Sequence, residues 1–215
     1  MLRSGVSMTR SDVALSVPRT RGRRRAGFFL HRITAVLAVG ILLAACGGGN
    51  GSSTTFRNLA GKVIVAPFGY RLDPTPGAVG QITRAIFDRY GGDSSPVRAA
   101  FVAGFKANYV DDSTGEGIAV TILQFKSRSA ASRYLSETAP QTLIYAAATH
   151  SPYEPIPGAI AVDGTKAYAG EYAHGILMAR GTFYAQLIYV NVSNLPAPIE
   201  LKSWALAQYN RLIPA

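Results

Sequence analysis

The stretch at residues 118–125, IAVTILQF, is the part of this 215-residue chain that decides the fold. Apolar side chains occupy nearly every position, whereas a strand with one face in water alternates apolar and polar residues. A run this short predicts a strand rather than a long buried helix. We therefore expect a central strand that is covered on at least one side.

The segments on either side of this stretch support a sheet. Residues 101–109 alternate apolar side chains with Lys106 and Asn108, which predicts a strand with one buried face, and DDSTGEG at residues 111–117 predicts the turn between the two strands. Ser127 or Ser129 is expected to cap a following helix, because a serine oxygen accepts a hydrogen bond from an early helical N–H. Pro140 must interrupt that helix.

Further elements are predicted from periodicity and turn signals. Val79, Ile82, Ile86 and Tyr90 recur at helical spacing after Pro76 and predict one amphipathic helix that ends at Gly91-Gly92. KVIVA predicts a strand, and three antiparallel strands follow the proline-rich loop THSPYEPIPG, with turns at Asp163-Gly164 and Arg180-Gly181. A last helix begins after Pro198. The predicted strands are residues 62–66, 101–109, 118–125, 159–162, 166–178 and 182–192.

These elements predict an α+β fold, with a single antiparallel sheet and helices packed on one face. Residues 101–147 and 166–212 can be laid over each other as two ββα units. The expected core residues are Ile86, Val120, Ile122, Phe125, Leu187 and Trp204.

The first 45 residues have the order of a secretory signal, with basic, then apolar, then small residues. The apolar run at residues 33–45 has 13 residues, whereas a membrane-spanning helix needs roughly 20. Arg24-Arg25 ahead of Phe28 also looks like a twin-arginine signal, so the export route stays open. Met1 and Met8 are both possible starts.

Leu43-Ala44-Ala45-Cys46, which contains the only cysteine, resembles the bacterial lipoprotein box. The resemblance implies that a diacylglyceryl group is added to the Cys46 thiol, that residues 1–45 are removed, and that Cys46 becomes the first residue of the mature chain. It also implies anchoring at the extracytoplasmic face of the cell membrane. No other thiol remains for a disulfide.

Composition sets limits on the mature chain. Residues 1–45 hold eight of the 22 basic and one of the 12 acidic residues, which leaves 14 and 11 and a net charge of +3. A nucleic-acid partner is therefore not expected. Residues 46–55 form a lipidated cysteine with a flexible Gly/Ser tether, and residues 56–215 suit one α+β domain, expected to be monomeric.

The lipoprotein box, the tether and a domain carrying AVTILQFKSRSAASRYL and RGTFYAQLIYV together resemble uncharacterised actinobacterial lipoproteins. The overall shape is loosely similar to small envelope lipoproteins with a Mog1/PsbP-like fold. The resemblance carries over no functional residue.

No recognised catalytic motif occurs in the sequence: G-x-S-x-G, the phosphate loop, G-x-G-x-x-G, H-E-x-x-H and S-x-x-K are all absent. Only His150 and His174 remain in the mature chain, so neither a metal site nor a cofactor is expected. The leading interpretation is a non-catalytic protein that binds a lipid, a glycan or a partner protein. The alternative is a cell-envelope hydrolase with an unrecognised carboxylate or Ser/His site.

Tyr168, Tyr172 and His174 follow each other at even spacing, which places them on one face of a strand. We expect them to contact an envelope lipid or glycan, with Tyr153 in the loop at residues 152–157 at the rim; tyrosines that merely favour strands, beside a surface histidine, are the plainer alternative. Asp111, Asp112 and Glu116 are expected to be a solvated turn rather than a calcium site, because their spacing does not fit an EF-hand.

Overall fold

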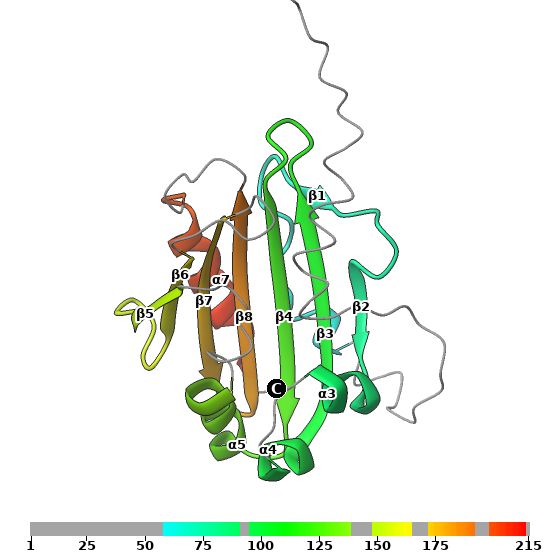
Figure 1. Ribbon diagram of the computed structural model, residues 1–215, viewed down its shortest axis with the longest axis vertical. Coiled ribbons are helices and arrows are strands. Elements are labelled where there is room, and N and C mark those ends of the chain that lie inside the picture. The colour runs from blue at the N-terminus through cyan, green and yellow to red at the C-terminus, as the bar shows by residue number, and fades with distance from the viewer. Residues whose placement is uncertain (1–57, 91–94, 139–147, 165–171, 192–197, 214–215) are drawn as a thin grey trace, which may run out of the picture.

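The protein, seen in a computed structural model, is described for residues 58–90, 95–138, 148–164, 172–191 and 198–213. These residues form one antiparallel sheet of eight strands, in the order β1-β3-β4-β8-β7-β6-β5, with β2 also paired to β3 (Figure 1). The strands are β1 (Arg71–Leu72), β2 (Val79–Ile82), β3 (Phe101–Val110), β4 (Gly117–Phe125), β5 (Ala148–Pro152), β6 (Ile160–Gly164), β7 (Tyr172–Arg180) and β8 (Phe183–Asn191).

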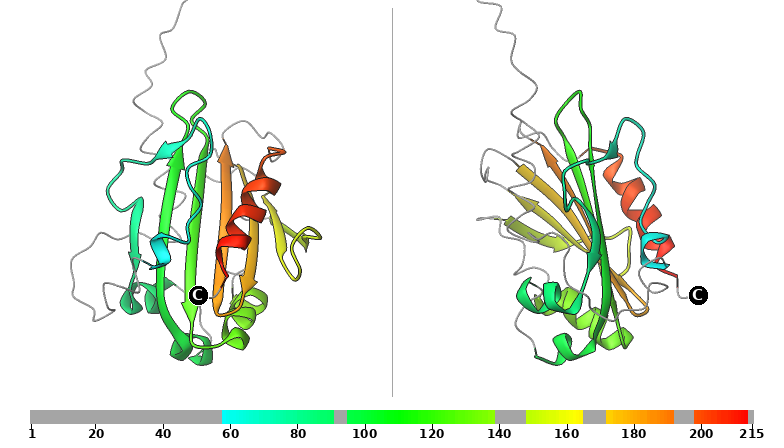
Figure 2. Two further views of the ribbon diagram at one scale, coloured as in Figure 1. Left: turned by 180° about the vertical axis from the view of Figure 1, so that it is seen from behind. Right: turned by 90° about the vertical axis from the view of Figure 1, so that its right-hand side faces the viewer.

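Helices lie on both faces of this sheet. Figure 2 shows α7 (Leu201–Arg211) on one face, and α3 (Arg84–Tyr90), α4 (Ser95–Ala100) and α5 (Arg128–Arg133) at the far end of the other. A short π-helical turn, η2 (Tyr134–Thr138), continues α5. We call the two sides of the sheet the α7 face and the α5 face. No helix in the described ranges is long and apolar enough to cross a membrane.

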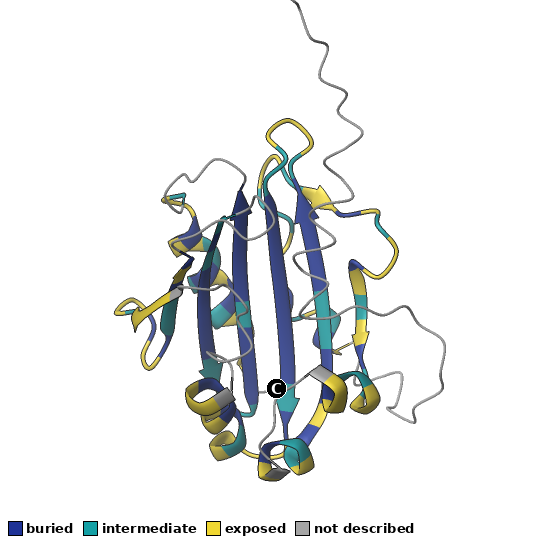
Figure 3. Cartoon of the chain, viewed as in Figure 1, coloured by how far each residue is buried: buried dark blue, intermediate teal, exposed yellow. Residues whose placement is uncertain are grey.

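The central position of β4 confirms the prediction from IAVTILQF. β4 pairs with β3 on one side and β8 on the other, and alternate residues enter two separate cores. Val120 and Ile122 pack on the α7 face, while Ala119 and Leu123 pack on the α5 face. Most of β4 is dark blue, that is buried, in Figure 3, and Gln124 is intermediate. Nearly every residue of the strand is apolar because neither side of the sheet is open to water there.

The predicted class, α+β with a single antiparallel sheet, is confirmed. The helices, however, cover both faces rather than one. The chain follows the expected ββα order twice, as β3-β4-α5 and β7-β8-α7, but the two helices pack on opposite sides. The reason is that β4 and β8 carry apolar side chains toward both faces, so each face needs its own cover.

The predicted helix after Pro76 is wrong in its first half. Val79–Ile82 forms β2, which pairs antiparallel with β3, and only Arg84–Tyr90 is helical. Gly77 has a φ of 82°, a left-handed conformation that a continuing helix cannot hold. The helix begins instead at Arg84, directly after Thr83, whose Oγ1 accepts a hydrogen bond from the Ile86 N–H at 3.4 Å.

The predicted strand at residues 62–66 is also wrong, because this segment joins no sheet. Val63 and Ile64 are buried against the α7 face, but side chains satisfy their backbone groups. The Gln208 amide bonds the Ile64 N–H and the Lys62 carbonyl, and the Tyr109 hydroxyl donates to the Ile64 carbonyl at 2.7 Å. The β-branched residues thus fill a core without pairing as a strand.

In the C-terminal half the three predicted strands are present with shifted ends. Asp163 and Gly164 lie inside β6 rather than in a turn, and the start of the proline-rich loop forms the edge strand β5. β7 begins at Tyr172 in the described residues and turns at Gly181, with a φ of 58°, into β8. Ser127 caps α5, as expected, by accepting from the Ala130 N–H at 3.2 Å. Pro140 lies outside the described residues.

Four of the six expected core residues, Val120, Ile122, Phe125 and Leu187, are at most 1% exposed. Ile86 is half-buried. Its neighbour Phe87 occupies the core instead and stacks on Phe101 with ring centroids 4.1 Å apart. Trp204 is half-buried on α7 and meets Tyr70 edge-on. Cys46 and the tether lie outside the described residues.

Candidate functional site

Strand register lines up a row of side chains across the α7 face. Ile118, Tyr189, His174 and Asp163 are successive cross-strand partners on β4, β8, β7 and β6. His174 Nδ1 lies 2.8 Å from Asp163 Oδ1, and the His174 ring stacks against Tyr189 with centroids 6.4 Å apart. The His174 side chain is 15% exposed and that of Asp163 is 52% exposed. The outer end of the row is therefore an oriented imidazole, that of His174, with its carboxylate partner Asp163 at the edge of solvent.

Glu116 links this row to the segment that precedes β1. The Tyr70 hydroxyl donates to Glu116 Oε2 at 3.1 Å. Burial, and then the Glu116 carboxylate, raise the pKa of the Tyr70 phenol well above its usual value. Burial followed by hydrogen bonding to Glu116 raises the pKa of Tyr189 as well. Both tyrosines therefore stay protonated and act as donors to one carboxylate.

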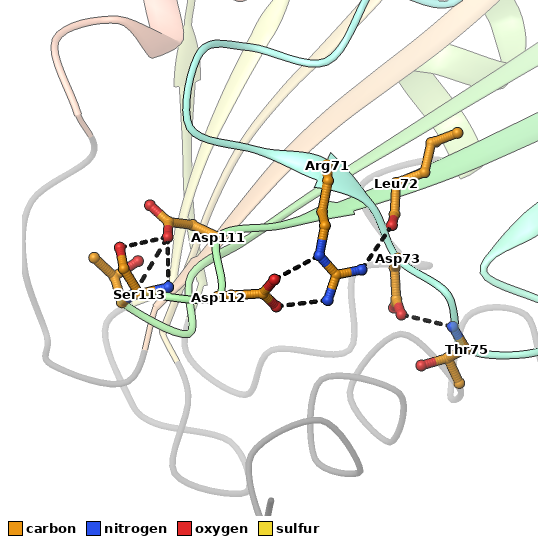
Figure 4. Close-up of polar contacts among 8 residues, drawn as sticks. Arg71, Leu72, Asp73, Thr75, Asp111, Asp112 and Ser113 are labelled. Carbon is orange, nitrogen blue, oxygen red and sulfur yellow. Dashed lines mark hydrogen bonds and ion pairs between the residues drawn. The ribbon is translucent and has the colours of Figure 1, made fainter. Parts of the chain in front are cut away.

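The acidic turn between β3 and β4 is engaged in local contacts (Figure 4). Asp111 Oδ1 accepts from the Ser113 N–H and hydroxyl at 2.7 and 2.6 Å, and these hydrogen bonds lower the pKa of Asp111. The Arg71 guanidinium donates two hydrogen bonds of 2.5 and 2.7 Å to the Asp112 carboxylate, and they lower the pKa of Asp112. The carboxylates of Asp111, Asp112 and Glu116 thus bond to different partners. The described part of the chain holds no group of three or more His, Cys, Asp or Glu arranged for a metal ion.

The structure brings together two of the four proposed contact residues. Tyr172 lies on β7 two residues before His174, on the same face, opposite Asn191, which is 1% exposed. Tyr168 lies outside the described residues.

Tyr153 lies elsewhere on the same face. Its N–H donates to the Ala159 carbonyl at 2.9 Å, at the opposite end of β6 from Asp163. Four residues of strand correspond to about 13 Å. The loop at residues 152–157 therefore does not rim Tyr172 and His174; it packs onto the core through Ile156, which is 1% exposed. The Tyr153 hydroxyl is buried without a hydrogen-bond partner among the described residues, and burial raises its pKa.

The two histidines in the described part of the chain lie on opposite faces. His150 pairs with Val162, which packs in the α5-face core, whereas His174 pairs with Asp163 on the α7 face. Adjacent positions of β6 point to opposite sides of the sheet. The two imidazoles therefore do not converge.

Sequence reasoning missed Tyr70, Tyr189 and Asp163. Tyr189 alternates with Leu187 on one face of β8, but only the pairing of β7 with β8 brings it beside His174. Asp163-Gly164 has the composition of a turn, but Asp163 lies in β6 as the strand partner of His174. Tyr70 follows a turn and carries no periodic signal at all.

Comparison with known proteins places the chain in no family. No family model matches it, and no curated protein matches its sequence. Among solved structures, the extracellular domain of PknH from Mycobacterium tuberculosis is similar, with 10% identity and a TM-score of 0.48; the match covers 72% of this chain and 94% of that one. At that identity and TM-score, the likeness assigns no function to this chain.

Proposed function

We propose that this chain is a lipoprotein of the cell envelope, anchored through Cys46 at the extracytoplasmic face of the membrane. The order of basic, apolar and small residues, followed by Leu43-Ala44-Ala45-Cys46, supports export and lipidation. Two acyl chains hold a protein stably at a membrane, whereas a single chain is marginal. The described fold begins by residue 59, so a tether of about a dozen residues separates it from the anchor.

The domain binds a lipid, a glycan or a partner protein and catalyses no reaction. The observation that supports this proposal is that the carboxylates near the tyrosine-bearing part of the α7 face are already bonded. Glu116 accepts from Tyr70, and Asp163 bonds His174. A general acid or base needs to reach its substrate by direct hydrogen bonding, whereas these carboxylates hold neighbouring side chains in place. Tyr172 and His174 are the contact residues we propose for the ligand.

Native mass spectrometry of the lipidated protein, purified from its own membrane, tests the binding proposal. A co-purifying mass from an envelope lipid or glycan is expected. The variants Tyr172→Ala and His174→Ala should lose that mass without unfolding. His150→Ala is the matched control, because His150 is an exposed histidine on the opposite face, and it should keep the mass.

One observation favours the alternative, a hydrolase. His174 is oriented by a carboxylate at Nδ1, as the general base of a nucleophilic enzyme is. Its strand partners and the residues two positions away on β7 are Asp163, Tyr189, Tyr172 and Ile176; none of these described neighbours is a serine, threonine or cysteine. Turnover of a wall glycan that is abolished by His174→Gln or Glu116→Gln, together with no co-purifying mass, would replace the binding proposal by the hydrolase.

A further inference from the structure

Three large apolar side chains, on the segment before β1 and just before α7, are unusually exposed. Phe68 is 105% exposed, Ile199 is 87% exposed and Val65 is 74% exposed, and these are the three most exposed large apolar residues in the described ranges. Single exposed apolar residues are common, so a docking surface needs neighbouring apolar side chains.

A contact between the two segments brings the turn that carries Phe68 next to α7. Tyr70, two residues after Phe68, meets Trp204 of α7 edge-on, with ring centroids 5.7 Å apart. Ile199 lies just before α7, where the Trp204 N–H donates to the Glu200 carbonyl. Figure 2 shows residues 58–70 and α7 on the same face. We call this surface the end patch; its residues are Phe68, Tyr70 and Trp204.

The segment that displays Phe68 is held in position. The Tyr70 N–H donates to the Pro67 carbonyl at 3.0 Å, and Gly69 has a φ of 87°, so Phe68 lies at the tip of a tight turn. Tyr70 and Arg71 are then fixed to Glu116 and Asp112 of the β3–β4 turn. The aromatic ring is therefore presented to solvent by a fixed backbone, which lowers the entropic cost of binding.

The rim of the end patch is acidic. It carries Asp111, Asp112 and Glu116 of the β3–β4 turn, against Arg71, which is bonded to Asp112. This charge disfavours contact with anionic lipid headgroups. It favours a partner whose apolar residues are flanked by cations, because complementary charges steer encounter and exclude wrong partners.

We infer that the end patch binds an extracytoplasmic protein segment with aromatic or aliphatic residues flanked by lysine or arginine. The inference goes beyond the proposed binding function, whose contact residues Tyr172 and His174 lie outside the end patch. Phe68 enters an apolar pocket of that partner, and the acidic rim pairs with its basic flanks. Large apolar anchors surrounded by a polar rim are the usual arrangement of an interface.

Trp204 is the only tryptophan, so its fluorescence reports on the end patch directly. The mature protein is titrated with a synthetic Phe-Leu-Phe peptide that carries two lysines at each end, and with the same peptide carrying glutamates. The lysine peptide should shift Trp204 emission saturably, and raised salt should weaken its binding several-fold. Phe68→Ser should abolish the shift. Ile213→Ser, another exposed apolar residue that follows the C-terminal end of α7, is the matched control and should retain it.

Three results would overturn the inference. The first is an equal response to both peptides or an unchanged response in Phe68→Ser. The second is a shift with phosphatidylglycerol vesicles and none with the lysine peptide, which would assign the patch to the membrane. The third is self-association at rising concentration that Phe68→Ser removes, which would assign it to a second copy. Loss of a co-purifying mass in Tyr172→Ala is independent of Phe68, so failure here is distinguishable from failure of the proposed function.

Discussion

The side-chain amide of Gln208 bonds the backbone on both sides of Val63, at Lys62 and at Ile64. Gln208 Oε1 accepts from the Ile64 N–H at 3.1 Å, and Gln208 Nε2 donates to the Lys62 carbonyl at 2.9 Å. Gln208 is fully buried on α7. One side chain thus replaces the strand pairing that the segment lacks and fixes the N-terminal part of the domain to the last helix.

Replacing Gln208 by leucine should therefore destabilise the domain by about 2–4 kcal/mol. The change keeps the apolar volume but leaves one buried N–H and one carbonyl without partners, at a cost of roughly 1–3 kcal/mol each. Urea unfolding measures the free energy. Lys202→Ala, at an exposed position of the same helix, should change it by less than about 0.5 kcal/mol. Equal stability of Gln208→Leu and the wild type would show that the segment at residues 62–64 needs no such clamp.

Two aromatic residues expected in the core should differ in their energetic contribution. Phe125 is 1% exposed and contacts three other aromatic rings, so Phe125→Ala should cost about 3–5 kcal/mol. Trp204 is only half-buried, so Trp204→Ala should cost less, about 1–3 kcal/mol. Thermal or urea unfolding ranks the two. The reverse order would place Trp204 in the core and remove it from the end patch.

Gly104 on β3 should not tolerate a methyl group. A Cβ there would lie 2.7 Å from Leu123 Cδ2 and 2.9 Å from Ile82 Cβ, whereas a Cβ at Gly80 on β2 meets nothing within 4 Å. Overpacking of a filled core costs about 1–3 kcal/mol. Gly104→Ala should lose that much in denaturant unfolding, while Gly80→Ala should be neutral or slightly stabilising. Equal effects of both changes would mean that β2 does not pack over Gly104.

Stability should fall at alkaline pH. Burial is the first cause that raises the pKa values of Tyr70, Tyr184 and Tyr189, so these phenols bind their protons more tightly when folded. Their contribution is complete below about pH 10, the pKa of an exposed tyrosine, and is lost as the pH rises above it. The free energy of unfolding, followed from about pH 8 upward, should decline only past that point.

The variant Tyr70→Phe should make this decline shallower, because one phenol fewer titrates on unfolding. Tyr172→Phe is the comparison, and it should keep the full decline because the three named phenols remain. A free energy of unfolding that stays level to about pH 11.5 would contradict the burial of these hydroxyls.

Anchoring should depend on one atom, the sulfur of Cys46. Cys46→Ala should leave unprocessed precursor in the membrane or release soluble protein, because no thiol remains to carry the lipid. Cell fractionation and the mass of the mature N-terminus measure both outcomes. Processing and membrane retention at the normal level in this variant would overturn the lipoprotein assignment.

Much of the fold was determined by local sequence patterns. IAVTILQF predicted a central strand covered on at least one side, because nearly every side chain in it avoids water, and β4 is that strand, buried on both faces. The DDSTGEG turn, the Ser127 cap and the β7–β8 hairpin were equally local, since each depends on residues within a few positions of one another. Cys46 and the tether that follows it to residue 55 are likewise predicted from a few neighbouring residues.

Tertiary structure decided what local patterns left degenerate. Val79–Ile82 has helical spacing, yet it forms a strand because the edge of β3 offers backbone partners and Gly77 turns the chain. Residues 62–66 have strand composition, yet Gln208 and Tyr109 satisfy their backbone instead.

The candidate site depends on register, which joins residues far apart in the chain. His174 meets Asp163 and Tyr189 only because β6, β7 and β8 pair as they do, while Tyr153 is carried to the other end of β6. A slip of one residue in that pairing would turn each of these side chains to the opposite face. Local sequence therefore determined the central strands β3, β4, β7 and β8, and the physical fit between strands determined which side chains meet.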